Sequence, residues 1–307
     1  MTADEPGTLP VVERARNERD ETPTVRDAAE DVSSRKLAQR PESTTAGKVW
    51  LVGAGPGDAG LLTLKGLRAL EAADVIVADR LGARAVLDGL AADGVVLRGE
   101  VVDVGKQPGH HAVPQDAINA LLVQLAQDGK TVVRLKGGDP YVFGRGGEEL
   151  AACQEAGIAV EVVPGITSAI SVPAIAGIPL THRGVATAFT VATAHDQIAS
   201  LSGGRDHTVV LLMGIATLAN SAIILARGER GGDCPVAVVE DGFGPRQRVT
   251  VGTLATIAHQ AAARGIRSPA VVVVGDVVRL SPYAPAALAT LDLSSYDPLA
   301  PERSPRA

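Results

Sequence analysis

Between residues 48 and 163, short apolar segments alternate with segments that have the spacing of amphipathic helices. The expected strands, apolar and rich in β-branched residues, are 48–53, 74–79, 131–136 and 158–163. The expected helices are 61–73, 114–130 and 147–156. Strands that alternate with helices predict a parallel sheet with helices packed on its faces. This alternation restricts the chain to the α/β class.

A second α/β half is expected after residue 164. Its expected strands are 188–195, 207–214, 235–241, 247–254 and 270–278, with one clear helix at 253–264. We therefore expect an N-terminal domain over 47–163 and a C-terminal domain over 164–282. Residues 1–46 are highly charged and poor in aliphatic side chains, so they predict a disordered tail. Residues 283–307 predict a loose C-terminal tail.

Composition argues against several classes of protein. A net charge of −6 and an aromatic content of 2% disfavour a nucleic-acid partner. Cys153 and Cys234 form no CxxC pair, and the adjacent His110 and His111 point in different directions, so no metal site is expected. No apolar run is long enough to span a bilayer, and the N-terminus lacks the apolar core of a signal peptide. We expect a soluble, cytoplasmic protein that binds no nucleic acid or membrane.

The segment 49–60, VWLVGAGPGDAG, places glycines after the first expected strand. Gly53 and Gly55 fit the dinucleotide-binding fingerprint, and Asp79 ends the second strand, where that fingerprint has an acidic residue. The third glycine, Gly57, comes one position early, and Asp58 would oppose a pyrophosphate. A nicotinamide-dependent oxidoreductase stays an alternative on these residues.

The segment 132–149, VVRLKGGDPYVFGRGGEE, is more specific. A strand that opens into Gly137, Gly138 and Asp139 frees backbone groups for a ligand. A β-turn would explain the Asp-Pro pair, but it does not explain the second glycine cluster at 143–149. This segment is therefore a candidate binding loop.

Residues 163–169 predict a strand-to-helix turn with Thr167 or Ser168 as the N-cap. Ligands of open α/β sheets bind at the carboxyl ends of the strands, so this turn is a second candidate loop. Cationic side chains that are candidates to receive an anionic ligand are Arg80, Lys106, Arg145, His182 and Arg183.

Six segments, taken in order, resemble the tetrapyrrole methylase family. They are residues 49–70, 73–81, 104–122, 132–149, 161–170 and 177–184. The resemblance extends over about residues 47–282 and is to the branch that methylates uroporphyrinogen III. It implies a two-domain α/β fold with the active cleft between the domains, in a homodimer. It also implies S-adenosyl-L-methionine as the methyl donor, with S-adenosyl-L-homocysteine as its product.

The resemblance implies two methylations of uroporphyrinogen III, at C2 and C7, that give precorrin-2 by way of precorrin-1 for cobalamin or sirohaem synthesis. The implied donor contacts are Pro56, Gly137, Gly138, Asp139, Val142, Thr167, Ser168, Met213 and Gly242. The implied catalytic residues are Asp79, as a proton acceptor or a stabiliser of positive charge, and Lys106, as a proton donor. The candidate substrate contacts are Gly53, Gly55, Gly57, Arg80, Arg145, His182 and Arg183.

The sequence departs from the family pattern at Ala194, which stands where relatives have glycine, and a β-carbon there is expected to narrow the cleft. The segment before Lys48 is too short and too polar for a dehydrogenase/ferrochelatase module, so a trifunctional sirohaem synthase is not expected. Besides the oxidoreductase, two alternatives remain. One is a methylase of a later precorrin or corrinoid intermediate, and the other is a regulator that binds the donor without catalysis.

Overall fold

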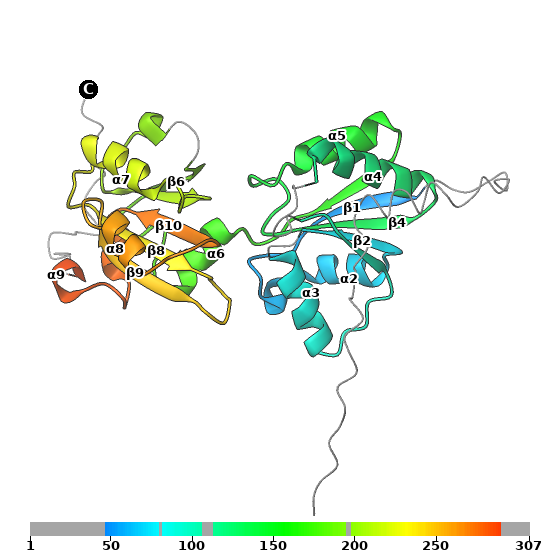
Figure 1. Cartoon of the computed structure of the whole chain (residues 1–307), viewed down its shortest axis with the longest axis horizontal. Coiled ribbons are helices and arrows are strands. Elements are labelled where there is room, and N and C mark those ends of the chain that lie inside the picture. The colour runs from blue at the N-terminus through cyan, green and yellow to red at the C-terminus, as the bar shows by residue number, and fades with distance from the viewer. Residues whose placement is uncertain (1–46, 80–81, 106–112, 195–197, 290–307) are drawn as a thin grey trace, which may run out of the picture. The chain divides into compact units, whose positions relative to one another are not determined.

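The computed structural model describes residues 47–79, 82–105, 113–194 and 198–289. They contain two five-stranded sheets, built from separate stretches of the chain and described in turn (Figure 1). The strands of the first sheet are β1 (Lys48–Gly53), β2 (Val75–Ala78), β3 (Glu100–Asp103), β4 (Thr131–Lys136) and β5 (Ala159–Val163). Its helices are η1 (Ala59–Leu61), α2 (Leu64–Glu71), α3 (Ala83–Ala92), α4 (Gln115–Gln127) and α5 (Gly146–Glu155).

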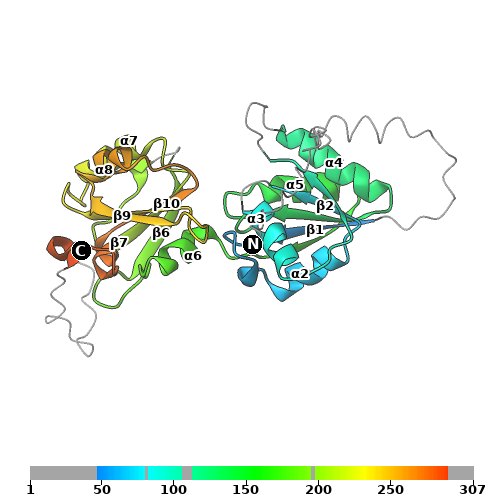
Figure 2. The same cartoon turned by 60° about the horizontal axis from the view of Figure 1, so that its bottom comes forward.

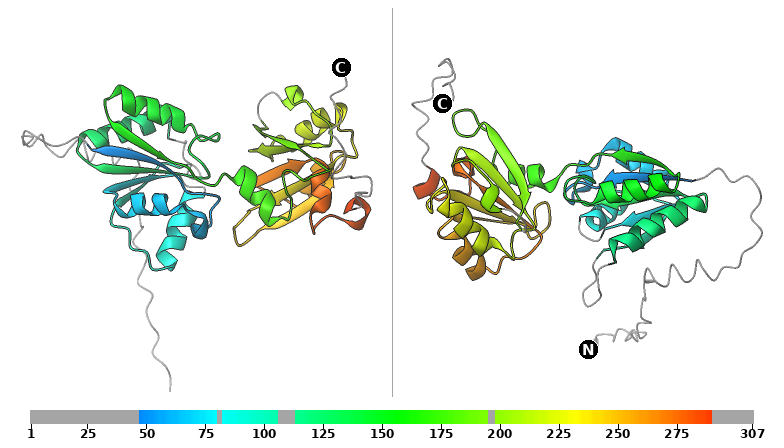
Figure 3. Two further views of the ribbon diagram at one scale, coloured as in Figure 1. Left: turned by 180° about the vertical axis from the view of Figure 1, so that it is seen from behind. Right: turned by 90° about the horizontal axis from the view of Figure 1, so that it is seen from above.

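The first sheet is parallel throughout and has the order β3-β2-β4-β1-β5. Helices α2 and α3 cover one face, and α4 and α5 cover the other, as Figure 1 and the rear view in Figure 3 show. The expected parallel sheet is thus confirmed. Sequence reasoning did not foresee α3 or β3, a strand of four half-exposed residues on the edge of the sheet.

The alternation of side chains along β4 decides which layer each residue enters. Val133 and Leu135 pack in one core cluster with residues of α2 and α3. Successive strand residues point to opposite faces, so Arg134 and Lys136 enter the layer of α4 and α5. Both of these charged side chains are buried. The centre of the sheet is therefore apolar on one face and charged on the other.

The second sheet has the order β6-β7-β10-β8-β9. Its strands are β6 (Ala188–Thr193), β7 (His207–Leu212), β8 (Pro235–Glu240), β9 (Arg248–Thr253) and β10 (Ala270–Val274). Its helices are α6 (Ser168–Ile175), η2 (Ile198–Ser200), α7 (Leu218–Arg227), α8 (Ile257–Ala263), η3 (Asp276–Leu280) and α9 (Ala286–Ala289). Only β6 and β7 pair in parallel, and the other three pairs are antiparallel.

Helices lie on both faces of the second sheet (Figure 2), and each face is packed in a core cluster of its own. Residues of α7 and α8 pack on one face, against Leu211, Val238 and Val272 among others. Helix α6 packs on the opposite face, against Val210 and Val273 among others. The helix expected at 253–264 is α8, and α7 was not expected.

Among the described residues, no helix is both long and apolar enough to cross a membrane, and no group of side chains could hold a metal ion. Cys153 and Cys234 are both buried free thiols, and burial raises their pKa to about 11 and about 12.

Candidate active site

Three glycines bring the backbones of three loops into direct contact at the carboxyl ends of β1, β4 and β5. A β-carbon built on Gly53 would lie 2.5 Å from the Cα of Gly165 and 2.6 Å from the carbonyl oxygen of Gly138. One built on Gly165 would lie 2.2 Å from that same oxygen. Gly55 and Gly138 also exchange backbone hydrogen bonds of 3.1 and 2.8 Å. No other residue type allows this approach, so the three loops form one junction.

The side chain of Asp139 connects two of the three loops by hydrogen bonds. Its Oδ1 accepts a hydrogen bond of 2.8 Å from the backbone N–H of Tyr141, and its Oδ2 accepts one of 3.0 Å from that of Gly165. Thr167, one of the two N-cap residues that the sequence predicted, is the N-cap of α6, and its hydroxyl accepts from the N–H of Ala169. A β-carbon on Gly138 would lie 3.7 Å from the Cα of Thr167. The candidate segments 53–55, 137–139 and 167–168 are thus adjacent.

Five described residues other than glycine have a positive φ, and all of them lie on candidate loops. They are Phe143, Arg145, Met213, Asp241 and Phe243, with φ between 50° and 66°. Such backbone costs about 1–3 kcal/mol per residue and clusters at ligand sites. Large apolar side chains are also exposed around these loops. They are Tyr141, Phe143, Ile166, Ile170 and Met213. Exposed apolar side chains beside strained backbone favour these loops as binding segments.

Met213 and Gly242 follow β7 and β8, two strands that run in the same direction because each is antiparallel to β10. The loops after them therefore lie at the same end of the second sheet, where these two strands finish. A β-carbon on Gly242 would lie 2.8 Å from Cγ1 of Val172, one turn along α6 from Ser168. Gly242 thus packs on the helix that Thr167 caps.

Asp79 follows β2, and its side chain is about one-third exposed, at 32%. Its backbone N–H donates to the carbonyl of Leu135 over 3.0 Å. Nη2 of Arg134 donates to its Oδ1 over 2.5 Å. The candidate proton acceptor is therefore held at the end of the central strands with one carboxylate oxygen already engaged.

Comparison with known proteins shows that residues 48–258 match the model of the Tetrapyrrole (Corrin/Porphyrin) Methylases. The chain belongs to the tetrapyrrole methylases. It is 50% identical over 242 residues to an S-adenosyl-L-methionine-dependent uroporphyrinogen III methyltransferase of Methanosarcina barkeri, which covers 76% of this chain and 93% of the relative. It is 51% identical over 241 residues to a sirohaem synthase of Gluconobacter oxydans, over 76% of this chain and 50% of that protein.

Solved structures of tetrapyrrole methylases share the fold. The uroporphyrin-III C-methyltransferase of Thermus thermophilus complexed with S-adenosyl homocysteine superimposes with a TM-score of 0.64 and 38% identity, over 76% of this chain and 94% of that one. A cobalt precorrin-4 methyltransferase aligns with a TM-score of 0.65 at 24% identity, over 75% of this chain and 95% of that one, which supports the fold alone. The expected α/β methylase fold is confirmed.

The remaining candidate residues of this tetrapyrrole methylase have varied surroundings. Arg80 and Lys106 lie outside the described residues. Arg145 is exposed and makes a bidentate ion pair with Glu148, at 2.8 and 2.6 Å. His182 exchanges backbone hydrogen bonds with Ala186, and the intervening turn leaves Arg183 exposed. Their contacts with substrate stay a prediction, as do the donor contacts of Pro56 and Val142.

Gly53 and Gly55 are buried in the glycine junction, which gives them a structural reason to be glycine beside the predicted substrate contact. Gly57 has a φ of 121°, and among the described residues a β-carbon there would meet only the side chain of Ala85. Asp58 caps η1 by accepting from the N–H of Gly60 over 2.8 Å. This cap explains an acidic residue where a dinucleotide site would avoid one.

Ala194 is buried in a core cluster of the second sheet. Its β-carbon lies 3.1 Å from the position a β-carbon on Gly214 would take. The methyl group is thus accommodated in the core, in contrast to the expectation that it narrows the cleft.

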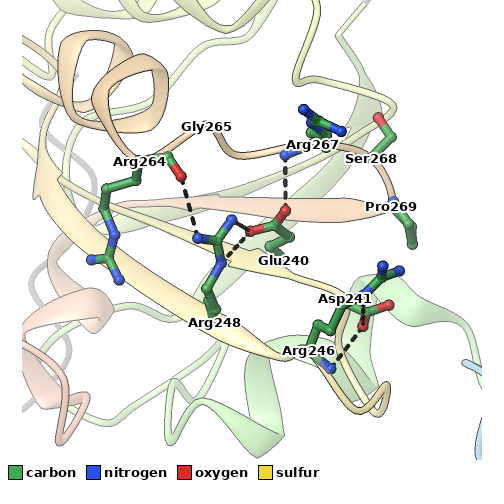
Figure 4. Close-up of a pocket in the computed structure, with 9 residues that line it drawn as sticks. All are labelled: Glu240, Asp241, Arg246, Arg248, Arg264, Gly265, Arg267, Ser268 and Pro269. Atoms are coloured by element: carbon green, nitrogen blue, oxygen red, sulfur yellow. Dashed lines mark hydrogen bonds and ion pairs between the residues drawn. The ribbon is translucent and has the colours of Figure 1, made fainter.

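A charged hollow of about 600 Å³ lies beside the Gly242 loop (Figure 4). Glu240 accepts from Nε of Arg248 over 2.8 Å and from the backbone N–H of Arg267 over 3.0 Å. The guanidinium groups of Arg264 and Arg267 lie on opposite sides of the Glu240–Arg248 pair in Figure 4, so they do not converge on a ligand. The contacts of Glu240 hold the end of β8, where the loop that contains Gly242 begins.

Sequence reasoning missed three buried charges of the first half, Arg134, Lys136 and Glu149. The signal was present, because RLK interrupts an apolar strand and a buried charge requires a partner.

Proposed function

We propose that this chain transfers methyl groups from S-adenosyl-L-methionine to C2 and C7 of uroporphyrinogen III and so produces precorrin-2. The observation that carries the proposal is the glycine junction, which places the candidate donor segments 137–139 and 167–168 side by side. Relatives named for this activity are about half identical to the chain and are spanned over nearly their whole length.

The residues present fit the donor. Gly138 has a φ of 68° and carries no side chain where the candidate donor segments meet, and Met213 presents an exposed thioether side chain on a strained turn. Thr167 and Ser168 supply hydroxyl groups at the start of α6. When bound, the sulfonium of S-adenosyl-L-methionine supplies an activated methyl group.

The protein then has two tasks, to align the attacking carbon with that methyl group and to manage one proton. A carbon–methyl bond forms at the tetrapyrrole as the sulfur–methyl bond breaks. The attacked pyrrole carbon carries a side chain and no hydrogen, so the resulting cation becomes neutral by losing a proton from another position of the macrocycle. Asp79, with its second carboxylate oxygen unbonded in the described part of the chain, is positioned to accept that proton or to stabilise the positive charge. Exposed Arg145 and Arg183 are the proposed contacts for substrate carboxylates.

We further propose that the enzyme acts in the cytoplasm as a homodimer and binds neither nucleic acid nor membrane. The absence of a spanning helix among the described residues and the net charge of −6 argue against membrane and nucleic-acid partners, and the homodimer and the location are taken from the family resemblance. Size-exclusion chromatography with light scattering tests the dimer.

An anaerobic assay with uroporphyrinogen III and S-adenosyl-L-methionine, followed by mass spectrometry of the product, tests the activity. A gain of two methyl groups is expected. Gly138→Trp should abolish the gain, because the indole would fill the junction. Gly157→Trp is the matched control, since Gly157 also has a positive φ, of 71°, but has open space around it.

The alternatives give different results. Binding of the donor without a mass gain would support a regulator, and methylation of a later precorrin alone would indicate a related methylase. Binding of NADH in titration would support the oxidoreductase.

A further inference from the structure

Strand β4 lies at the centre of the first sheet, between β2 and β1, yet it carries two buried cations. The side chains of Arg134 and Lys136 are 2% and 3% exposed and point to the same face of the sheet. Charges in such a place are costly unless they are paired and hydrogen bonded. Their partners therefore indicate why the chain keeps them.

One partner is Glu149, in the first turn of α5, which is fully buried. Its Oε1 accepts from Nε of Arg134 over 3.0 Å and from Nζ of Lys136 over 2.8 Å. Gln115, at the start of α4, donates to the same oxygen over 3.2 Å. Burial lowers the pKa of Lys136, which shows that this cluster is desolvated. Glu149 thus fixes both cations from one side.

The second partner of Arg134 is Asp79. While Nε of Arg134 binds Glu149, Nη2 donates to Oδ1 of Asp79 over 2.5 Å. Nη1 donates to the backbone carbonyls of Val77 and Leu135 over 3.4 and 3.3 Å. The guanidinium is planar and its donors have fixed directions, so these contacts leave it one orientation. A carboxylate bound to this fixed guanidinium is itself fixed.

The contacts of these charged residues have two separate effects, the packing of α5 on β4 and the positioning of Asp79. Lys136 and Arg134 both join β4 to α5 through ion pairs with Glu149. Arg134 also reaches the end of β2 and holds the side chain of Asp79, which is partly exposed and belongs to no core cluster. A purely structural role for Arg134 does not require that contact.

We propose that Arg134, itself oriented by Glu149, is a positioning residue that aims the second carboxylate oxygen of Asp79 at the reacting tetrapyrrole. This inference rests on the proposed function. Because Arg134 is only 2% exposed, its expected effect on the reaction passes through Asp79. Replacement of Arg134 should therefore lower kcat, because a misplaced Asp79 carboxylate slows the reaction. It should leave the KM for the donor nearly unchanged.

A double-mutant cycle separates positioning from stability. Asp79→Asn is expected to lower kcat by about 10²–10⁴-fold, the usual range for a proton-transfer group. Arg134→Gln should lower kcat by about 10–100-fold through misplacement of Asp79. If Arg134 acts through Asp79, the double variant loses no more than about threefold beyond Asp79→Asn alone. Multiplied losses, or a kcat for Arg134→Gln equal to that of the wild type, would overturn the proposal.

Two further variants keep the test decisive. Arg134→Lys preserves the positive charge but not the fork that binds two carboxylates, so it should also lower kcat, and it serves where Arg134→Gln does not fold. Arg205→Gln is the control, because Arg205 is a partly buried arginine that pairs with Asp233 and Asp276, away from the candidate site. It should lose stability and keep the wild-type kcat. Failure of the wild type to methylate uroporphyrinogen III would refute the proposed function, a result distinct from normal turnover with an unaffected Arg134 variant.

Discussion

The glycine junction makes a sharp prediction for Gly165→Ala. The new β-carbon would lie 2.2 Å from the carbonyl oxygen of Gly138, whereas ordinary contact begins at 3.4 Å. The two backbones must therefore separate by about 1.2 Å, the difference between these distances. The atoms that the new β-carbon would meet are all main-chain atoms, so rotation of a side chain cannot relieve the clash.

That separation has an energetic cost that can be approximated. The carbonyl oxygen of Gly138 accepts the 3.1 Å hydrogen bond from Gly55, and the return bond from Gly138 is 2.8 Å. Losing both costs about 1–3 kcal/mol, at about 0.5–1.5 kcal/mol each. Strain from the added carbon brings the expected loss of unfolding free energy to about 2–4 kcal/mol. The same movement separates 137–139 from 167–168, so the affinity for S-adenosyl-L-homocysteine should fall by at least about tenfold, equivalent to about 1.4 kcal/mol.

Urea denaturation and isothermal titration calorimetry measure the two effects. Gly147→Ala is the matched control, because Gly147 lies in α5 and a β-carbon there meets nothing within 4 Å. That change should be neutral or stabilising by up to about 1 kcal/mol. The reasoning would be refuted if Gly165→Ala were as stable as Gly147→Ala and bound the ligand as tightly.

Two other predictions concern buried titratable groups. Iodoacetamide should leave Cys153 and Cys234 unmodified in the native protein at mildly alkaline pH and alkylate both in urea. The reason is that the thiolate is the reactive form and burial raises the pKa of the two thiols to about 11 and about 12. Intact mass measures the labelling, and rapid labelling of the native protein would contradict the prediction. Burial lowers the pKa of Lys136 below its ordinary value of 10.5. Between the lowered pKa of the folded protein and 10.5, the unfolded chain holds a proton that the folded chain has lost. The unfolding free energy should therefore rise with pH across that range. Lys136→Met should remove that rise from the pH dependence of the unfolding free energy, and parallel curves for the two proteins would show the assignment to be wrong.

The parts of the fold that the sequence foretold are those with a local signature. The apolar segments of the first half became its strands, and the Thr167 cap follows from a hydroxyl before a helix. The antiparallel pairing in the second sheet had no such signature. Every residue of β8 is buried, and a strand covered on both faces has the same apolar pattern in either direction.

The candidate site was foreseen in its glycines but not in its charges. Gly137 and Gly138 stood out because glycine clusters are visible in a sequence. Arg134 and Glu149 are distant in the chain, so their pairing depends on how α5 packs on β4 and could not be read from spacing. The positive φ values of Met213 and Asp241 likewise arise from tertiary structure, since neither residue favours that conformation strongly by itself.

The order β3-β2-β4-β1-β5 places β1, the first strand of the described residues, in the interior of its sheet. Its neighbours β4 and β5 begin 78 and 106 residues after β1 ends, so neither edge of β1 can pair until those segments have been made. During synthesis the first half cannot assemble stepwise from its N-terminus. A nascent chain arrested before residue 131 should therefore remain sensitive to protease along β1, and release past residue 163 should protect it in a single step.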